Sequence, residues 1–126
     1  MPALSNYAEI QALNNLFRTV PVYVSLYKTN PTDLNTGEEV TGGSYSRQPV
    51  TFNAPTQIND RGTIKNAADI VFPVATAEWG TVTYVGITDA FTGGNLLSYK
   101  AVTNPRAVLI SDRIRFLANE LSIDLD

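Results

Sequence analysis

The chain contains no histidine and no cysteine among its 126 residues. The absence of cysteine excludes disulfides and thiol nucleophiles, and the absence of both residues excludes zinc sites built from nitrogen and sulfur ligands. Histidine is also the commonest general acid or base, so much familiar enzyme chemistry is unavailable to the chain. We therefore expect no catalytic residues, no cofactor site and no metal site.

Charge is sparse as well: charged residues make up 17% of the chain, with nine basic and twelve acidic side chains. The basic residues are spread along the sequence and form no basic stripe of the kind that binds a phosphate backbone. No apolar run approaches the roughly 18 residues of a membrane span, and no cationic region followed by an apolar run marks a leader at the amino terminus. We expect neither nucleic acid nor membrane as a partner.

The length predicts a single domain over residues 1–126, with one helical signal at its start. Asn6 and Glu9 have the spacing of a capping box, and apolar residues then recur at helical spacing until Pro21. The pattern predicts a helix over residues 6–19. A β domain is expected to follow over residues 21–126.

After the helix, short alternating segments are separated by turn-forming residues. Residues 81–88 are expected to be the most central strand, paired antiparallel with 96–102 through a turn at 89–95 that contains Gly93 and Gly94. Residues 53–66 are expected to form a polar loop. We predict a mainly β fold, a β-sandwich or small barrel of about seven to eight antiparallel strands with one N-terminal α-helix. The strands are expected at 22–29, 47–52, 68–74, 81–88, 96–102, 107–117 and 121–125.

Few side chains offer a chemical site. Four carboxylates gather late in the sequence without the glycine-containing acidic loop that binds calcium, so we interpret them as solvated; they are Asp112, Glu120, Asp124 and Asp126. The single tryptophan, Trp79, is predicted to lie in the core. Tyr23 and Tyr27 lie opposite the aliphatic positions of their strand, and we leave open whether they face solvent or a partner.

Ordered blocks of sequence run through nearly the whole chain. They include GGSYSRQPVTF at 42–52, FPVATAEWGTVT at 72–83 and LSIDLD at 121–126, with further blocks at 4–9, 22–27, 30–33 and 86–97. In this order the blocks resemble a family of small tailed-bacteriophage virion structural proteins, whose members are often labelled tail-fibre or head-decoration proteins. The segment 53–66 matches that family only in being polar.

The resemblance implies a non-enzymatic structural protein of a bacteriophage virion, assembled in the host cytoplasm. Because the chain has no repeats and no coiled-coil heptads, we expect a capsid decoration, or cement, protein that stabilises the particle by docking on capsid subunits. One alternative is a tail-fibre, head-fibre or baseplate component that acts as an adaptor or host-contact module. A second alternative is a carbohydrate-binding module.

The expected partners are other virion proteins, either the major capsid protein or tail and fibre proteins. A homo-oligomer is also expected, with a trimer as one form. Docking would use the helix or an exposed strand edge, the latter by strand addition. The expected interface residues are Tyr7, Ile10, Leu13, Phe17, Tyr23 and Tyr27.

Overall fold

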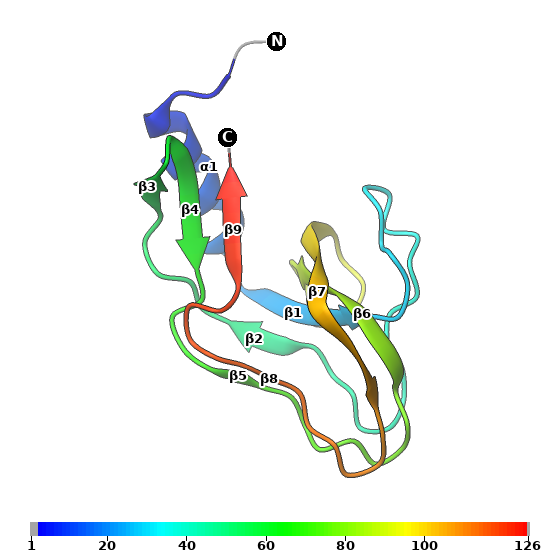
Figure 1. The fold of residues 1–126 in the computed structure, drawn as a ribbon. Coiled ribbons are helices and arrows are strands. Elements are labelled where there is room, and N and C mark those ends of the chain that lie inside the picture. The colour runs from blue at the N-terminus through cyan, green and yellow to red at the C-terminus, as the bar shows by residue number, and fades with distance from the viewer. Residues whose placement is uncertain (1–2, 126) are drawn as a thin grey trace.

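The computed structural model describes residues 3–125, which form one helix and nine strands (Figure 1). The strands pair antiparallel in a four-stranded sheet of order β2-β1-β6-β7, a three-stranded sheet of order β3-β4-β9 and a ribbon of β5 and β8. No closed barrel forms within these residues, so the mainly β, sandwich-like prediction is confirmed. The strands are β1 (Val22–Tyr27), β2 (Gln48–Val50), β3 (Thr56–Ile58), β4 (Arg61–Lys65), β5 (Ile70–Val71), β6 (Gly80–Thr88), β7 (Leu96–Val108), β8 (Arg115–Phe116) and β9 (Ser122–Leu125).

The helix α1 (Asn6–Phe17) starts from a different cap than the sequence pattern predicts. Ser5 is the N-cap, and its hydroxyl accepts a hydrogen bond from a backbone N–H three residues later at 3.1 Å. The predicted capping box is therefore wrong: Asn6 is already helical, and Glu9 is buried with its carboxylate bonded to the Gln57 amide at 3.1 Å. The helix ends before the predicted residue 19 because the next residue after it leaves helical geometry, with φ −123°.

The four-stranded sheet follows the sequence pattern closely. β6 lies between β1 and β7, as expected for the most central strand, and its antiparallel pairing with β7 confirms the predicted hairpin. β1 ends at Tyr27, somewhat short of the predicted residue 29. β7 continues well beyond the predicted residue 102, because pairing with β6 resumes at Arg106 after an irregular stretch at 102–105.

The segment 53–66, expected to be a loop, forms a hairpin of β3 and β4. Asn59 and Asp60 make its turn with positive φ angles of 51° and 63°, a conformation that Asn and Asp tolerate better than most residues. The inward positions of β4 are Gly62 and Ile64, which face α1. A Cβ on Gly62 would lie 3.0 Å from the Cβ of Glu9, so this glycine allows the strand and the helix to approach closely.

The strands predicted at 68–74 and 107–117 are largely wrong in extent. Residues 107–108 form the end of β7 and pair with β6, and the rest of the two segments forms only the short ribbon of β5 and β8. Pro73 has no N–H to donate to a ladder beyond β5. The chain instead turns after β7, where the Leu109 N–H donates to the Asp112 carboxylate at 2.9 Å and Ser111 adopts a φ of 74°. The predicted strand 47–52 shortens to β2, beyond which Phe52 makes an isolated bridge.

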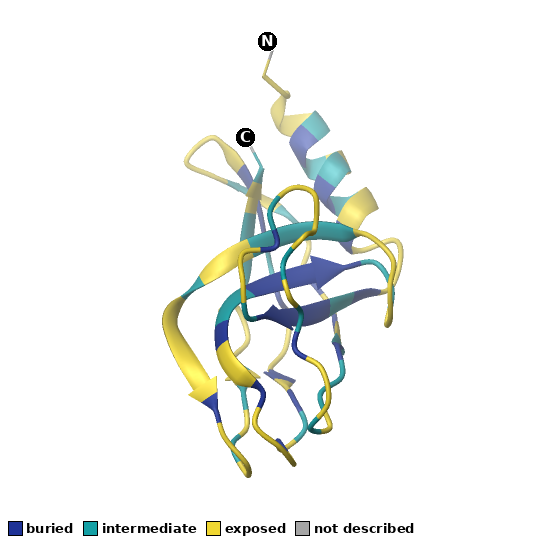
Figure 2. Ribbon diagram, turned by 90° about the vertical axis from the view of Figure 1, so that its right-hand side faces the viewer, coloured by how far each residue is buried: buried dark blue, intermediate teal, exposed yellow. Residues whose placement is uncertain are grey.

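The core lies on the inner face of the four-stranded sheet and includes an aromatic cluster. Trp79 is 2% exposed, which confirms its predicted place in the core, and its indole N–H donates to the Gly43 carbonyl at 2.8 Å. The rings of Tyr45 and Phe72 pack around it. Figure 2 shows the buried residues concentrated on the inner strands, while most of β7 is exposed.

Candidate assembly surface

The outer edge of β7 is the most extensive unpaired strand edge of the four-stranded sheet. Within residues 3–125, no strand pairs with this edge, and the opposite edge of the sheet is formed by the three-residue β2. A strand edge of this kind presents unsatisfied N–H and C=O groups that another chain can pair with. The bulge at 102–105 and Pro105 interrupt the edge on one side, and a second register shift at Leu97 interrupts it on the other, so the regular part lies at residues 98–101.

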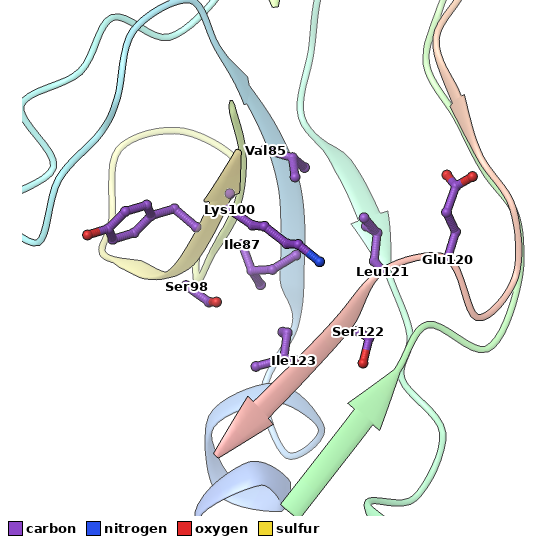
Figure 3. Close-up of a pocket in the computed structure, with 10 residues that line it drawn as sticks. Val85, Ile87, Ser98, Lys100, Glu120, Leu121, Ser122 and Ile123 are labelled. Atoms are coloured by element: carbon purple, nitrogen blue, oxygen red, sulfur yellow. The ribbon is translucent and has the colours of Figure 1, made fainter. Parts of the chain in front are cut away.

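An apolar groove lies between this edge and the C-terminal segment of the chain (Figure 3). β6 contributes the buried side chains of Val85 and Ile87, and the opposite wall is formed by half-buried Leu121 and Ile123. The enclosed space is only about 50 Å³, and an adjoining depression of about 300 Å³ continues it along β7. Small-molecule sites usually enclose roughly 300–1,000 Å³, so the narrow part of the groove suits an inserted side chain better than a ligand.

Two opposite charges line the groove from its two walls. Lys100 extends from β7, and Glu120 lies on the facing wall next to Leu121 (Figure 3). Neither is among the ion pairs that the described residues form within 4.0 Å. Both charges are exposed, and both remain available to a partner.

On the face of β7 away from the groove, Tyr99 connects the strand to neighbouring parts of the chain. The Tyr99 hydroxyl donates to the Asp33 carboxylate at 2.5 Å, and its ring packs against Tyr84 at a centroid distance of 6.5 Å. The hydrogen bond to Asp33 raises the pKa of Tyr99 above its ordinary value. The 29–38 loop is thereby tied to the regular part of the β7 edge.

A buried ion pair holds the β6–β7 turn in place. Arg47 is 8% exposed and binds the Glu39 carboxylate at two points, 2.9 Å from Nε and 2.8 Å from Nη2. Its Nη1 donates to the carbonyls of Ala90 and Gly93, both at 2.8 Å. The hydrogen bonds to Glu39 raise the pKa of Arg47. We refer to Arg47, Glu39 and the two carbonyls as the Arg47 clamp.

Tyr45 extends the clamp toward the core. Its hydroxyl donates to Glu39 at 2.6 Å and accepts from the Leu26 N–H at 3.0 Å. Burial first, and the hydrogen bond to Glu39 second, raise the pKa of Tyr45 far above its ordinary value. The phenol is therefore held in its protonated, hydrogen-bonding form.

The predicted interface residues fall into two groups. Leu13, Phe17 and Tyr27 are between 1% and 4% exposed and pack inside the protein's own core. Tyr7 is 74% exposed, whereas Ile10 and Tyr23 are half-buried. In this conformation, contact with a partner through these six residues would rest mainly on Tyr7, with Ile10 and Tyr23 contributing in part.

Sequence reasoning missed the groove formed by β7 and the C-terminal segment. The segments 96–102 and 121–125 were both expected to be strands, but their nearness depends on the order of strands in two different sheets. The sequence shows that Lys100 and Glu120 are charged, but it does not show that they line the same groove. That conclusion requires the order of the strands in the two sheets.

The late carboxylates do not gather at one point. Asp112 lies 3.8 Å from the Arg106 guanidinium, whereas Asp124 accepts a hydrogen bond from the Thr63 hydroxyl at 3.0 Å; Asp126 lies outside the described residues. Within residues 3–125, no group of three or more acidic side chains is placed to hold a metal ion. The same range holds no helix with the length and apolar character needed to cross a membrane.

These features define a small β-sandwich protein whose free strand edge and surface groove are suited to contacts with other proteins. A family model described as "Podophage GP4 fiber I protein gp80" matches residues 3–124, and the chain belongs to this family of phage fibre structural proteins. No curated protein matches the chain.

Proposed function

We propose that the protein is a non-enzymatic adaptor or host-contact subunit of a phage fibre that joins other virion proteins. The family match over residues 3–124 supports a fibre rather than the capsid decoration expected from the sequence. A short module without repeats fits a joint or a terminal piece of a fibre better than its shaft. The protein is assembled in the host cytoplasm and carried in the virion.

The observation that carries this proposal is the unpaired β7 edge beside the apolar groove. A neighbouring chain can add a strand to such an edge, with backbone hydrogen bonds giving affinity and side chains in the groove giving specificity. The Arg47 clamp holds the turn from which β7 starts, so the edge is presented in a fixed position. Such preorganisation lowers the entropy lost on assembly.

A carbohydrate-binding role has less support. Sugar binding by stacking uses a row of exposed aromatic rings, and the only tryptophan of the chain is buried in the core. The exposed rings of Tyr7 and Phe91 lie on separate elements, α1 and the β6–β7 turn. The Tyr99 ring is held by its bond to Asp33 and its contact with Tyr84. We therefore place the function in assembly rather than in sugar recognition.

The test is the location and copy number of the protein in purified particles. Quantitative mass spectrometry of intact virions and of separated tail fractions would measure the number of copies, and gold-labelled antibodies would show their position by electron microscopy. We expect a low copy number confined to fibres. A copy number close to that of the capsid subunits, with label spread over the head, would reject the fibre proposal in favour of decoration.

A further inference from the structure

We propose that the β7 edge binds a second copy of this chain, in a two-fold pair centred on Tyr99 that joins two four-stranded sheets into one. This inference deepens the proposed function by naming one partner of the assembly surface. It rests on three features: the free edge, the alternation of faces along β7, and the two unpaired charges of the groove.

The alternation of faces along β7 limits how two copies can pair. Ser98 and Lys100 lie opposite Ile87 and Val85 in the ladder with β6, so both project toward the groove, whereas Tyr99 projects to the other face. Directly opposed residues of an antiparallel pair share a face. A two-fold axis normal to the sheet keeps each side chain on its own face, so each residue can lie opposite only a residue of the same face. The axis must therefore pass beside one residue, which then lies opposite its own copy.

Ser98, Tyr99 and Lys100 are the candidate central residues of a self-pair in the regular part of the edge. Centring on Lys100 would place two ammonium groups directly opposite each other. Centring on Ser98 would run the new ladder into the irregularity at Leu97, where the register with β6 shifts. Centring on Tyr99 avoids opposed lysines and keeps the central pair and the two flanking Ser98–Lys100 pairs within residues 98–101. It places the two Tyr99 side chains opposite each other on the outer face.

The charges of the groove are self-complementary in this arrangement. With Tyr99 on the axis, Lys100 lies opposite Ser98 of the second copy and next to that copy's groove, whose far wall carries Glu120. Two-fold symmetry creates the same contact twice. Each copy thus supplies one unpaired cation and one unpaired anion to reciprocal ion pairs, and each lysine is kept from repelling its symmetry mate.

A heterologous contact between β7 and a different edge lacks this reciprocity. The free edge of β9 could pair with β7 in such a contact, but it has only four residues. It carries Asp124, whose carboxylate is already bonded to Thr63. The groove instead places both members of the ion pair beside one edge. Isologous pairing is also the commonest symmetry of soluble oligomers.

The charge arrangement can be tested with purified full-length protein by sedimentation velocity over a range of concentrations. We expect a species of twice the 13.7 kDa chain mass. Lys100→Glu alone and Glu120→Lys alone should each weaken the dimer at least about tenfold, since each creates like-charge contacts, and the double variant should recover most of the loss. Arg113→Glu and Glu78→Lys reverse exposed charges outside the groove and should leave the dimer unchanged.

The register can be tested by cross-linking, because the chain has no cysteine of its own. Tyr99→Cys places two thiols opposite each other across the axis, within the reach of a disulfide, and mild oxidation should give a covalent dimer. Ala101→Cys lies on the same face two residues further on, and its two copies would be about 13 Å apart, too far to bridge. Ala101→Cys should therefore remain uncross-linked.

A monomer at all concentrations, a trimer, or faster cross-linking of Ala101→Cys than of Tyr99→Cys would overturn the two-fold pair. Insensitivity of the dimer to both single charge reversals would overturn it as well. None of these results depends on where the protein lies in the particle. The fibre proposal is decided separately by copy number and location in virions, so the two can fail independently.

Discussion

The Arg47 clamp makes the clearest quantitative prediction for stability. Glu39→Gln keeps the shape of the side chain but leaves the guanidinium of Arg47 buried without a counter-charge. Removing one partner of a buried ion pair typically costs about 3–5 kcal/mol. The Glu39 side chain is 23% exposed, which admits some solvent screening, so we expect the lower end, about 3 kcal/mol.

The assay is equilibrium urea unfolding, with thermal unfolding as a second measurement. Unfolding entropy of about 2.1 cal/mol/K per residue over 126 residues converts about 3 kcal/mol into a fall in Tm of about 11 °C. Arg47→Met should cost a similar amount, because it leaves the carbonyls of Ala90 and Gly93 without their donor. In the double variant both charges are gone, so its loss should be smaller than the sum of the single losses by about 1–3 kcal/mol.

A matched control lies in the same loop. Lys28 and Glu38 form an ion pair at 3.6 Å whose side chains are 30% and 65% exposed. Exposed pairs contribute about 1 kcal/mol or less, so Glu38→Gln should change stability little. If Glu39→Gln cost no more than Glu38→Gln, or if the Glu39 and Arg47 effects were simply additive, the clamp would not be a coupled buried pair and the reasoning would be refuted.

Three further predictions concern the helix cap, the buried phenol and the contact between α1 and β4. Ser5→Ala should cost about 1 kcal/mol in urea unfolding and Asn6→Ala much less, since Ser5 is the observed N-cap; the reverse order would restore the predicted capping box. Because the pKa of Tyr45 is raised in the folded state, the phenol of the unfolded chain ionises first, so stability should hold below pH 10 and fall above it. Urea midpoints measured from pH 8 to 11 should fall more steeply in the unmodified protein than in Tyr45→Phe. Parallel curves for the two proteins would contradict this prediction. Gly62→Ala should destabilise by about 1–3 kcal/mol through contact with Glu9 and Leu13, and an unchanged midpoint would show that α1 can move away at no cost.

The sequence was sufficient where periodicity and burial agree. The β6–β7 hairpin, the central place of β6 and the burial of Trp79 follow from β-branched runs, a double-glycine turn and a large apolar ring. Prediction failed where side chains are polar on one face: Arg61, Thr63 and Lys65 made β4 look like a loop, although Gly62 and Ile64 between them contact the helix and the core. The residue pattern of one strand does not reveal which of its faces is buried when a helix distant in the sequence covers that face.

The assembly surface was missed for a related reason. In the sequence, Lys100 and Glu120 look like ordinary surface charges. Only the order of strands in the two sheets places them on opposite walls of one groove. The predicted interface instead selected apolar helix positions, and burial of Leu13 and Phe17 shows that such positions serve the protein's own core. Apolar periodicity reports burial, and it does not distinguish a core from an interface.

The clamp and the edge are connected through the turn between β6 and β7. Asp89 closes this turn by accepting from the Asn95 N–H at 2.6 Å, and Arg47 holds the same turn by the carbonyls of Ala90 and Gly93. Since β7 begins directly after the turn, loss of the clamp should loosen the start of the edge and raise the entropic cost of pairing. Arg47→Met should therefore weaken self-association under conditions where the variant remains folded, whereas Glu38→Gln should not. Equal self-association of the two variants would show that the edge keeps its position without the clamp.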